Sequence, residues 1–188
     1  MIELLQINDS LPAPNLRLVV SPNDWQKASR QSAQGTPSAK GEAYREFFQT
    51  LIDDLREKHR FTSARIGQPQ NWYTFTSGIP GVSYSFSFAK GDRVRAEIYL
   101  DRGNAEENKR LFDLLLEKRA EIEQDFGGAL EWERLDARRA SRIAAYRPGS
   151  IQAGESELRA IHSWAIETLL RVKRVLGPRV SRALKSTG

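Results

Sequence analysis

The stretch that decides the fold class is NWYTFTSGIPGVSYSFSFAKGDRVRAEIYLD, residues 71–101. Its apolar and polar residues alternate, which is typical of strands with one buried and one solvated face. The alternation predicts three strands, at residues 71–78, 81–91 and 92–101. The tripeptide Lys90-Gly91-Asp92 is a hairpin signal, because glycine supplies the backbone angles of a tight turn. The stretch therefore predicts an antiparallel meander.

Aromatic residues are concentrated in the first of these strands. Alternation places Trp72 on the opposite face of the sheet from Tyr73 and Phe75. Aromatic side chains on a sheet face can stack unpaired bases in nucleic-acid-binding proteins. They belong more often to a core or to a sheet face that helices cover. Both interpretations of the first strand stay open.

Helical periodicity is evident on both sides of the meander. An apolar stripe predicts a helix over residues 42–59, with Tyr44, Phe47, Phe48, Leu51 and Leu55 inward. Asn104 and Glu107 form a capping box, so they predict the start of a second helix that runs to Phe126 and ends at Gly127-Gly128. A last helix begins at about Glu155, and Pro178 is expected to begin a final turn or short helix.

Two further strands are expected between the second and last helices, at LEWERL (residues 130–135) and SRIAAYR (residues 141–147). The predicted fold is α+β. It has an antiparallel sheet of about five strands with long helices on one face, in the order α-βββ-α-ββ-α. A short N-terminal strand pair, residues 2–7 and 16–20, flanks a proline-containing turn. The expected organisation is a junction segment at 1–26, a polar linker at 27–41 and an α+β domain at 42–188.

Composition narrows the class of protein. The chain has 188 residues, of which 39% are hydrophobic and 28% charged, and it has no cysteine. Disulfides, thiolate nucleophiles and cysteine zinc sites are therefore excluded. The sequence has no run of about 18 apolar residues, so it predicts no membrane-spanning helix. Acidic Glu3 argues against a secretory signal. The absence of cysteine fits a reducing compartment, so a cytoplasmic protein is expected.

The net charge of +5 is unevenly distributed. Residues 1–137 contain 18 Lys and Arg against 21 Asp and Glu, whereas residues 138–188 contain 11 against 3. Such asymmetry indicates a polyanionic partner, although a basic tail can also serve solubility alone. The predicted nucleic-acid-binding residues are Arg134, Arg138, Arg139, Arg142, Arg147, Lys173 and Arg174.

Guanidinium groups in and around a turn suit bidentate phosphate contacts, which is why these arginines are candidates. A purely structural interpretation competes with this one. In it, Arg142 pairs with Glu131 or Glu133 across the strand ladder, a contact worth under about 1 kcal/mol if exposed.

No complete catalytic constellation is present in the sequence. Phosphate-loop, dinucleotide-binding and nucleophile-elbow motifs are absent, and His59 and His162 lack partners at metal-ligand spacing. Asp101, Glu107 and Lys109 match the residue types of restriction-type nucleases, in which carboxylates hold Mg²⁺ beside a lysine. However, Glu107 and Lys109 fall in the first turn of a predicted helix, where capping explains Glu107 better. The sequence therefore predicts no catalytic residue, no metal and no cofactor.

Several ordered runs together resemble a bacterial domain family of unknown function. They are QPQNWYTFTSGIPGVSYSFSF, RAEIYLD and NKRLFDLLLEKRAEIEQDFGGALEWERLDARRASRIAAYRPG, followed by a last helix that contains Trp164. That family occurs C-terminal to restriction-nuclease-like modules, in proteins suspected of DNA metabolism or defence against foreign DNA. The resemblance covers about residues 42–185. It implies a C-terminal fragment or a reduced relative, whose nuclease-like module lies in the same or a partner chain.

The favoured function is a non-catalytic accessory domain that binds DNA or another nucleic acid through its basic C-terminal third. The alternative is a protein-interaction or homodimerisation module, which the strongly apolar helices and numerous aromatic residues favour. A stand-alone metal-dependent nuclease centred on Asp101, Glu107 and Lys109 is the third hypothesis.

Overall fold

The computed structural model describes residues 2–5, 13–16 and 38–186. The chain divides into two compact units, residues 1–37 and 38–188. In the first unit, β1 (Ile2–Leu5) pairs with β2 (Ala13–Leu16) in antiparallel fashion. The second strand lies earlier than predicted and contains Pro14, which a two-stranded ladder tolerates because its outer edges need no donor. Most of the predicted linker, residues 27–37, lies outside the described residues.

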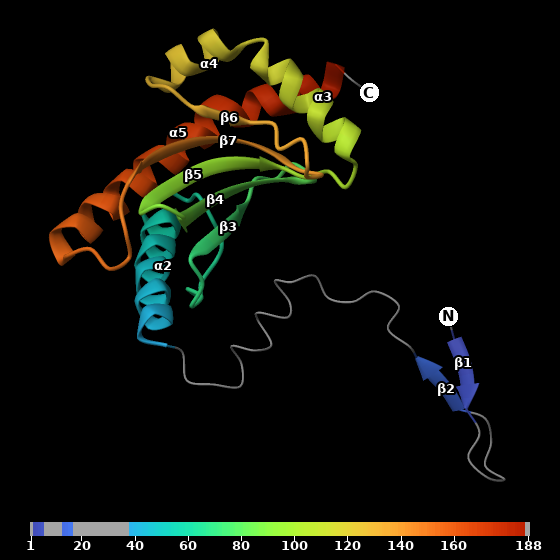
Figure 1. Ribbon diagram of the computed structural model, residues 1–188, viewed down its shortest axis with the longest axis horizontal. Helices are drawn as coiled ribbons and strands as arrows, with labels where there is room; N and C mark the ends of the chain where they lie inside the picture. The colour runs from blue at the N-terminus through green and yellow to red at the C-terminus, as the bar shows by residue number, and fades with distance from the viewer. Residues whose placement is uncertain (1, 6–12, 17–37, 187–188) are drawn as a thin grey trace. The chain divides into compact units, whose positions relative to one another are not determined.

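The second unit has the predicted α+β architecture (Figure 1). Its elements are α2 (Ala39–Glu57), β3 (Trp72–Thr76), β4 (Val82–Ala89), β5 (Arg93–Leu100), α3 (Ala105–Leu116), α4 (Arg119–Phe126), β6 (Glu131–Glu133), β7 (Ser141–Pro148) and α5 (Glu155–Ser186). Five strands form one antiparallel sheet in the order β3-β4-β5-β7-β6. The first three strands are the meander that the opening stretch predicts, and β7 and β6 extend it beyond β5.

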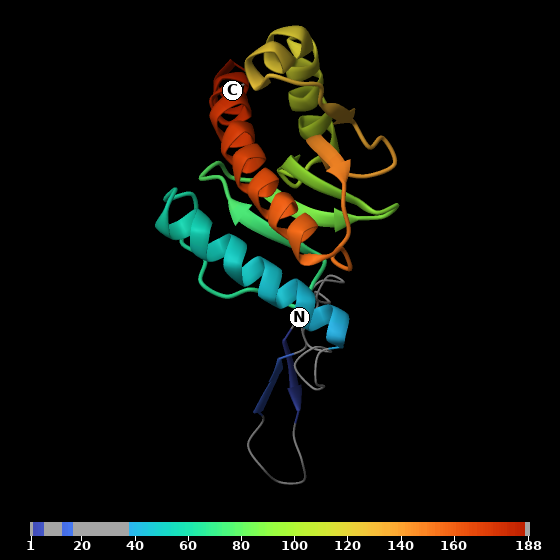
Figure 2. The ribbon, with the colours of Figure 1, turned by 90° about the vertical axis from the view of Figure 1, so that its left-hand side faces the viewer.

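Helices cover one face of this sheet and leave the other face open. Helices α2 and α5 cross the same face (Figure 2). Phe47 of α2 packs on Phe86 and Phe88 of β4, with ring centroids 5.7 and 4.9 Å apart. Trp132 of β6 packs on Phe112 of α3 at 6.0 Å on that side too. The alternation of each strand thus divides an apolar, helix-covered face from a polar open face, as predicted.

Local backbone signals explain where several elements begin and end. Gly91 and Asp92, in the turn between β4 and β5, both have positive φ, at 77° and 49°. Two such residues in succession are what a tight hairpin turn requires. Ser38 caps α2, because its Oγ accepts a hydrogen bond from the Gly41 N–H at 3.1 Å. Gly127, with φ of 78°, ends α4 in the left-handed conformation.

The predicted helix from Asn104 to Phe126 is two helices, because the chain bends between α3 and α4. Asn104 caps α3 as predicted, since its Oδ1 accepts from the Glu107 N–H at 3.2 Å. The reciprocal half of the predicted capping box is wrong. The Glu107 carboxylate lies beside Arg102 instead, with 3.7 Å between its Oε2 and the Arg102 Nε.

The predicted stop at Pro178 is also wrong, because α5 continues through it to Ser186. A proline inside a helix lacks one N–H donor and costs about 3 kcal/mol. Burial of Leu176 and Val180 on either side of Pro178 opposes that cost. In addition, the Arg179 Nη1 donates to the Val175 carbonyl at 2.8 Å.

Candidate functional site

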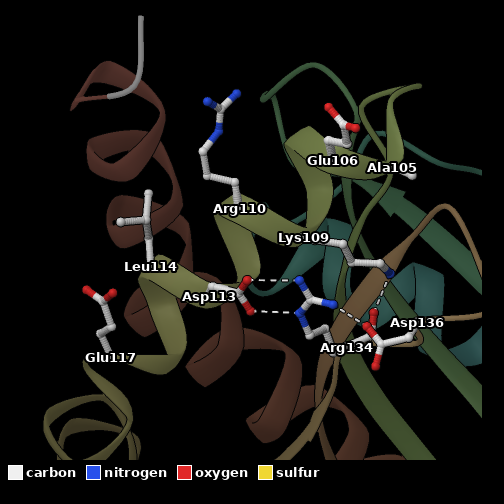
Figure 3. Close-up of a pocket in the computed structure, with 9 residues that line it drawn as sticks. All are labelled: Ala105, Glu106, Lys109, Arg110, Asp113, Leu114, Glu117, Arg134 and Asp136. Carbon is white, nitrogen blue, oxygen red and sulfur yellow. Dashed lines mark hydrogen bonds and ion pairs between the residues drawn. The ribbon is translucent and has the colours of Figure 1, made fainter.

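Arg134, the first predicted phosphate ligand, is held by carboxylates. It follows β6 and forms two parallel hydrogen bonds with Asp113 of α3, at 2.9 and 3.0 Å, and it also contacts Asp136 (Figure 3). These residues line an open cavity of about 510 Å³, together with Lys109, Arg110, Glu106 and Glu117. Four carboxylates and three cations line this cavity, so it has no excess positive charge for an anion.

Three more predicted arginines have carboxylate partners. Arg139 forms two hydrogen bonds with Asp101, at 2.6 and 2.7 Å, and this contact lowers the pKa of the Asp101 carboxyl. Arg142 pairs with Glu133 at 3.0 Å and with Glu97 at 3.3 Å. Arg147 pairs with Glu157 of α5 at 2.5 Å. The contact with Glu133 is the pairing across the strand ladder that the structural interpretation of Arg142 predicted.

The remaining three predicted cations are exposed. Arg138 lies in the turn before β7, and Arg174 lies on α5. Neither side chain has an ion pair with a residue that the structure describes. The Lys173 ammonium lies over the Phe61 ring, 4.8 Å from its centroid. Helix α5 covers the sheet face opposite to Arg142, so the seven predicted cations do not share one surface.

Asp101, Glu107 and Lys109 do not form a metal site. Asp101 is bound by Arg139, and the Lys109 Nζ donates to the carbonyls of Leu135 and Ala140 at 2.9 and 2.8 Å. It also contacts the Arg134 carbonyl and the Ser141 hydroxyl. No group of three or more His, Asp or Glu residues suited to a metal occurs among the residues with described positions.

The two histidines occupy structural positions. His59 is exposed just after α2. His162 of α5 lies edge-on to Phe47, with ring centroids 6.0 Å apart. Its Nε2 is 3.9 Å from an oxygen of Asp54. Neither histidine forms a hydrogen bond with a hydroxyl group among the residues that the structure describes, as the base of a nucleophile would.

The open face of the sheet presents a different arrangement. Strand register places Trp72, Ser87, Arg95 and Tyr146 in one row across β3, β4, β5 and β7. Aromatic rings thus lie at both ends of the row, with a small hydroxyl and a guanidinium between them. In each strand, the residue of this row alternates with the buried residues. The four side chains therefore lie on the face that the helices do not cover.

Below the rim of this face lies a buried ionic network. Glu97 has 5% of its surface exposed and pairs with Arg95 at 2.8 Å as well as with Arg142. Burial raises the pKa of the Glu97 carboxyl, and the two arginines oppose that rise. The Tyr146 hydroxyl donates to Glu133 at 2.6 Å. The network fixes both arginines at the floor of the face.

A cavity of about 400 Å³ opens above this network. Four cations and one carboxylate line it, together with the two aromatic rings of the row; the charged residues are Lys90, Arg93, Arg95, Arg142 and Glu133. The Arg93 guanidinium lies 4.2 Å from the centroid of the Tyr146 ring and also pairs with Glu131 at 2.9 Å. The lining therefore has an excess of positive charge beside exposed aromatic surface.

Sequence reasoning included only Arg142 of these cations. Alternation places Arg93 and Arg95 on the polar face of their strand. They were missed because residues 1–137 contain more Asp and Glu than Lys and Arg, so the count of charges favoured residues 138–188 instead. The signal that could have found them is the shared parity of Trp72 and the two arginines in neighbouring strands of a hairpin meander.

Fold and site together define a class: a two-layer α+β domain whose half-open antiparallel sheet carries a cation-rich cavity on its uncovered face. The chain belongs to the family described as domain of unknown function DUF4268, whose model matches residues 43–180. Searches of the curated proteins and of the solved structures gave no match. Within the described part of the chain, no helix has the length and apolar character needed to cross a membrane.

Proposed function

We propose that this protein is a non-catalytic accessory domain that binds nucleic acid and positions a nuclease-like module of the same or a partner chain. The observation that carries the proposal is the cavity on the open face, where four cations face one carboxylate. Phosphates are polyanions that Lys and Arg neutralise with release of counterions. The uneven charge of the chain, with 11 Lys and Arg against 3 Asp and Glu in residues 138–188, supports a polyanionic partner as well.

The cations at the rim of the cavity, Lys90 and Arg93, are able to bind a phosphate. Lys90 is exposed, and it has no ion pair with a described residue. Arg93 is paired with Glu131, but the two side chains are 45% and 48% exposed. An exposed pair is worth about 0–1 kcal/mol, so a phosphate can replace Glu131 at little cost. Arg95 and Arg142 are paired with Glu97 and Glu133 in the network beneath, so the positive charge offered to a ligand comes from Lys90 and Arg93 at the rim.

The predicted arginines outside this cavity have a secondary role in the proposal. Arg134, Arg139 and Arg147 are engaged by carboxylates. Arg138 and Arg174 are exposed and add to long-range attraction rather than to a defined site. The proposed contact surface therefore shifts from the basic C-terminal third to the open face of the sheet.

Fluorescence anisotropy with labelled single- and double-stranded DNA across a salt series tests the proposal. The variant Lys90→Ala/Arg93→Ala is compared with Arg45→Ala/Lys58→Ala, which removes the same charge from α2 and from the C-cap residue that follows it. We expect the first variant to weaken binding about 10-fold to 100-fold and to reduce the salt slope by about two. Absence of binding at low salt, or equal weakening by both variants, would overturn the proposal.

Binding without cleavage is part of the same proposal. The chain is incubated with Mg²⁺ and the DNA that it binds, and the products are separated by size. Intact DNA is expected. Cleavage that disappears in Glu107→Ala, with the fold of that variant verified by circular dichroism, would establish the metal-dependent nuclease instead.

A protein-interaction or homodimerisation module is the second candidate function. The specific observation in its favour is exposed apolar surface: Ile66 is 72% and Leu116 37% exposed. These side chains lie on separate elements, the segment after α2 and the end of α3, so they form no single described patch. Light scattering discriminates between the candidates, because a concentration-independent dimer without DNA affinity supports the second.

A further inference from the structure

Trp72 differs from the other tryptophans with described positions, because its ring has no aromatic contact and its indole no hydrogen bond. Trp132 packs on Phe112, and its Nε1 donates to Glu123 at 3.0 Å. Trp164 packs on Phe86. Trp72 begins the edge strand β3, is 38% exposed, and has neither a ring contact nor a hydrogen bond from its indole with any residue in the described ranges. A large apolar ring with a free N–H thus faces solvent at the cavity.

The residue beside Trp72 has unused hydrogen-bonding capacity. Ser87 is its direct partner across the ladder and lines the same cavity. Only 3% of Ser87 is exposed, yet its Oγ has no hydrogen-bond partner. Buried polar groups in folded proteins are nearly always satisfied, so an orphaned hydroxyl in a cavity wall indicates a ligand or water that completes it. This observation is independent of the aromatic ring and of the charges.

Cations lie at one side of this aromatic surface. The turn that holds Lys90 joins β4 to β5 and lies next to the start of β3, where the Asn71 Nδ2 donates to the Phe88 carbonyl at 2.9 Å. The Arg93 guanidinium presents a second flat surface, since it lies over the Tyr146 ring. A planar ring, a hydroxyl and a pair of exposed cations within one cavity are complementary to a base, its polar edge and a phosphate.

From this arrangement we infer that the cavity takes an unpaired nucleotide of a single-stranded nucleic acid. The base stacks on Trp72, its edge faces Ser87, and the adjoining phosphates contact Lys90 and Arg93. The inference rests on the proposed nucleic-acid binding and deepens it by naming the substrate class. A duplex does not satisfy this site, because paired bases are stacked inside the helix and present only their edges. The volume of about 400 Å³ lies in the range of sites for small ligands, about 300–1,000 Å³.

The test measures affinity of the full chain for three probes: a labelled single-stranded decamer, the matching duplex, and a labelled mononucleotide. The variants are Trp72→Ala, Trp72→Phe and, as a control on the same strand and face, Thr74→Ala. We expect Trp72→Ala to weaken decamer binding about 10-fold to 100-fold, as loss of one stacked base does. Trp72→Phe restores most of the affinity, and Thr74→Ala leaves it nearly unchanged. The salt slope is unchanged in Trp72→Ala, because no phosphate contact is lost.

The outcomes separate this inference from the proposed function. Equal binding of decamer and duplex, with no effect of Trp72→Ala, overturns the single-strand inference and leaves nucleic-acid binding standing. Absence of binding to decamer and duplex at low salt overturns both. A mononucleotide bound as tightly as the decamer shows a free-nucleotide site and overturns the strand inference. Thermal unfolding confirms the fold of each variant, and Trp72→Phe keeps the test decisive if Trp72→Ala does not fold.

Discussion

Lys109 is buried, with 9% of its surface exposed, and its ammonium is bound by oxygens from one short connection. The carbonyls of Arg134, Leu135 and Ala140 all accept from its Nζ. A cation buried in this way is costly unless hydrogen bonds satisfy it. Here three carbonyl dipoles replace water, so one side chain of α3 holds the chain between β6 and β7 in place.

Replacement of Lys109 by methionine should therefore destabilise the domain. Lys109→Met keeps the length of the side chain but leaves the Ala140 carbonyl without a donor, whereas the Arg134 and Leu135 carbonyls keep their bonds from the Ser141 hydroxyl and the Arg138 N–H. We therefore expect a loss of about 1–3 kcal/mol in the free energy of unfolding. Urea denaturation at neutral pH measures it. Arg110→Met, the exposed neighbour on the same helix, is the control and should change stability by less than about 0.5 kcal/mol. Similar effects of both changes would contradict the role of Lys109.

The contact of Arg139 with Asp101 makes stability depend on pH in a defined direction. The pKa of folded Asp101 is lowered, chiefly by the hydrogen bonds from Arg139. A carboxyl with a lowered pKa adds stability that is present above its unfolded pKa of about 3.9 and is lost as pH falls through the lower folded value. The difference in unfolding free energy between wild type and Asp101→Asn should accordingly shrink between about pH 6 and about pH 3.

Urea titrations at the two pH values measure this difference. Glu106→Gln is the control, because Glu106 is exposed and has no ion pair with the described residues. Its difference from wild type should show no comparable shrinkage. A difference for Asp101→Asn that persists or grows at the lower pH would contradict the assignment.

At the scale of elements, the segment between α2 and β3 is irregular but closely docked. Gln49 of α2 accepts from the Gly67 N–H at 2.9 Å and donates to the Arg65 carbonyl at 3.0 Å. A Cβ on Gly67 would lie 2.5 Å from the Arg45 carbonyl oxygen and 2.6 Å from the Gln49 nitrogen. Both are backbone atoms of α2, so the contact cannot relax by rotation of a side chain.

Gly67→Ala should thus force the segment away from α2 and lower the free energy of unfolding by about 1–3 kcal/mol. Gly128→Ala is the matched control, because a Cβ there would meet nothing within 4 Å. Thermal unfolding followed by circular dichroism compares them. An unchanged midpoint for Gly67→Ala would show that the segment does not pack on α2 in solution.

At the scale of the whole molecule, the second unit has a hydrophobic core of its own. Its buried hydrophobic residues run from Phe48 to Val180. A fragment of residues 38–188 should therefore fold alone and unfold in one cooperative transition. Its thermal midpoint is expected within about 5 °C of the midpoint of the full chain. A fragment that is unfolded or aggregated would show that residues 1–37 contribute to folding.

The fold class was predictable because its signals are local. Alternation in residues 71–101 separates the faces of three strands, and the glycine turn at Gly91 joins two of them without any need of long-range information. Helix periodicity and the cap at Asn104 placed the helices in the same way. The errors, at the bend after α3 and at Pro178, arise where tertiary packing outweighs a local preference: α3 and α4 both contact α5, and Leu176 and Val180 are buried on either side of Pro178.

The candidate site was only partly predictable. By itself, the sequence determined the fold class, the placement of Trp72 on the face opposite Tyr73 and Phe75, and the uneven charge. Only the tertiary structure decided which cations have carboxylate partners: Asp101 and Arg139 are 38 residues apart in the chain and meet at 2.6 Å. Strand register also decided that Trp72, Ser87 and Arg95 form one row. Composition counts charges, whereas the long-range pairing of strands and helices determines which of them neutralise one another and which face solvent.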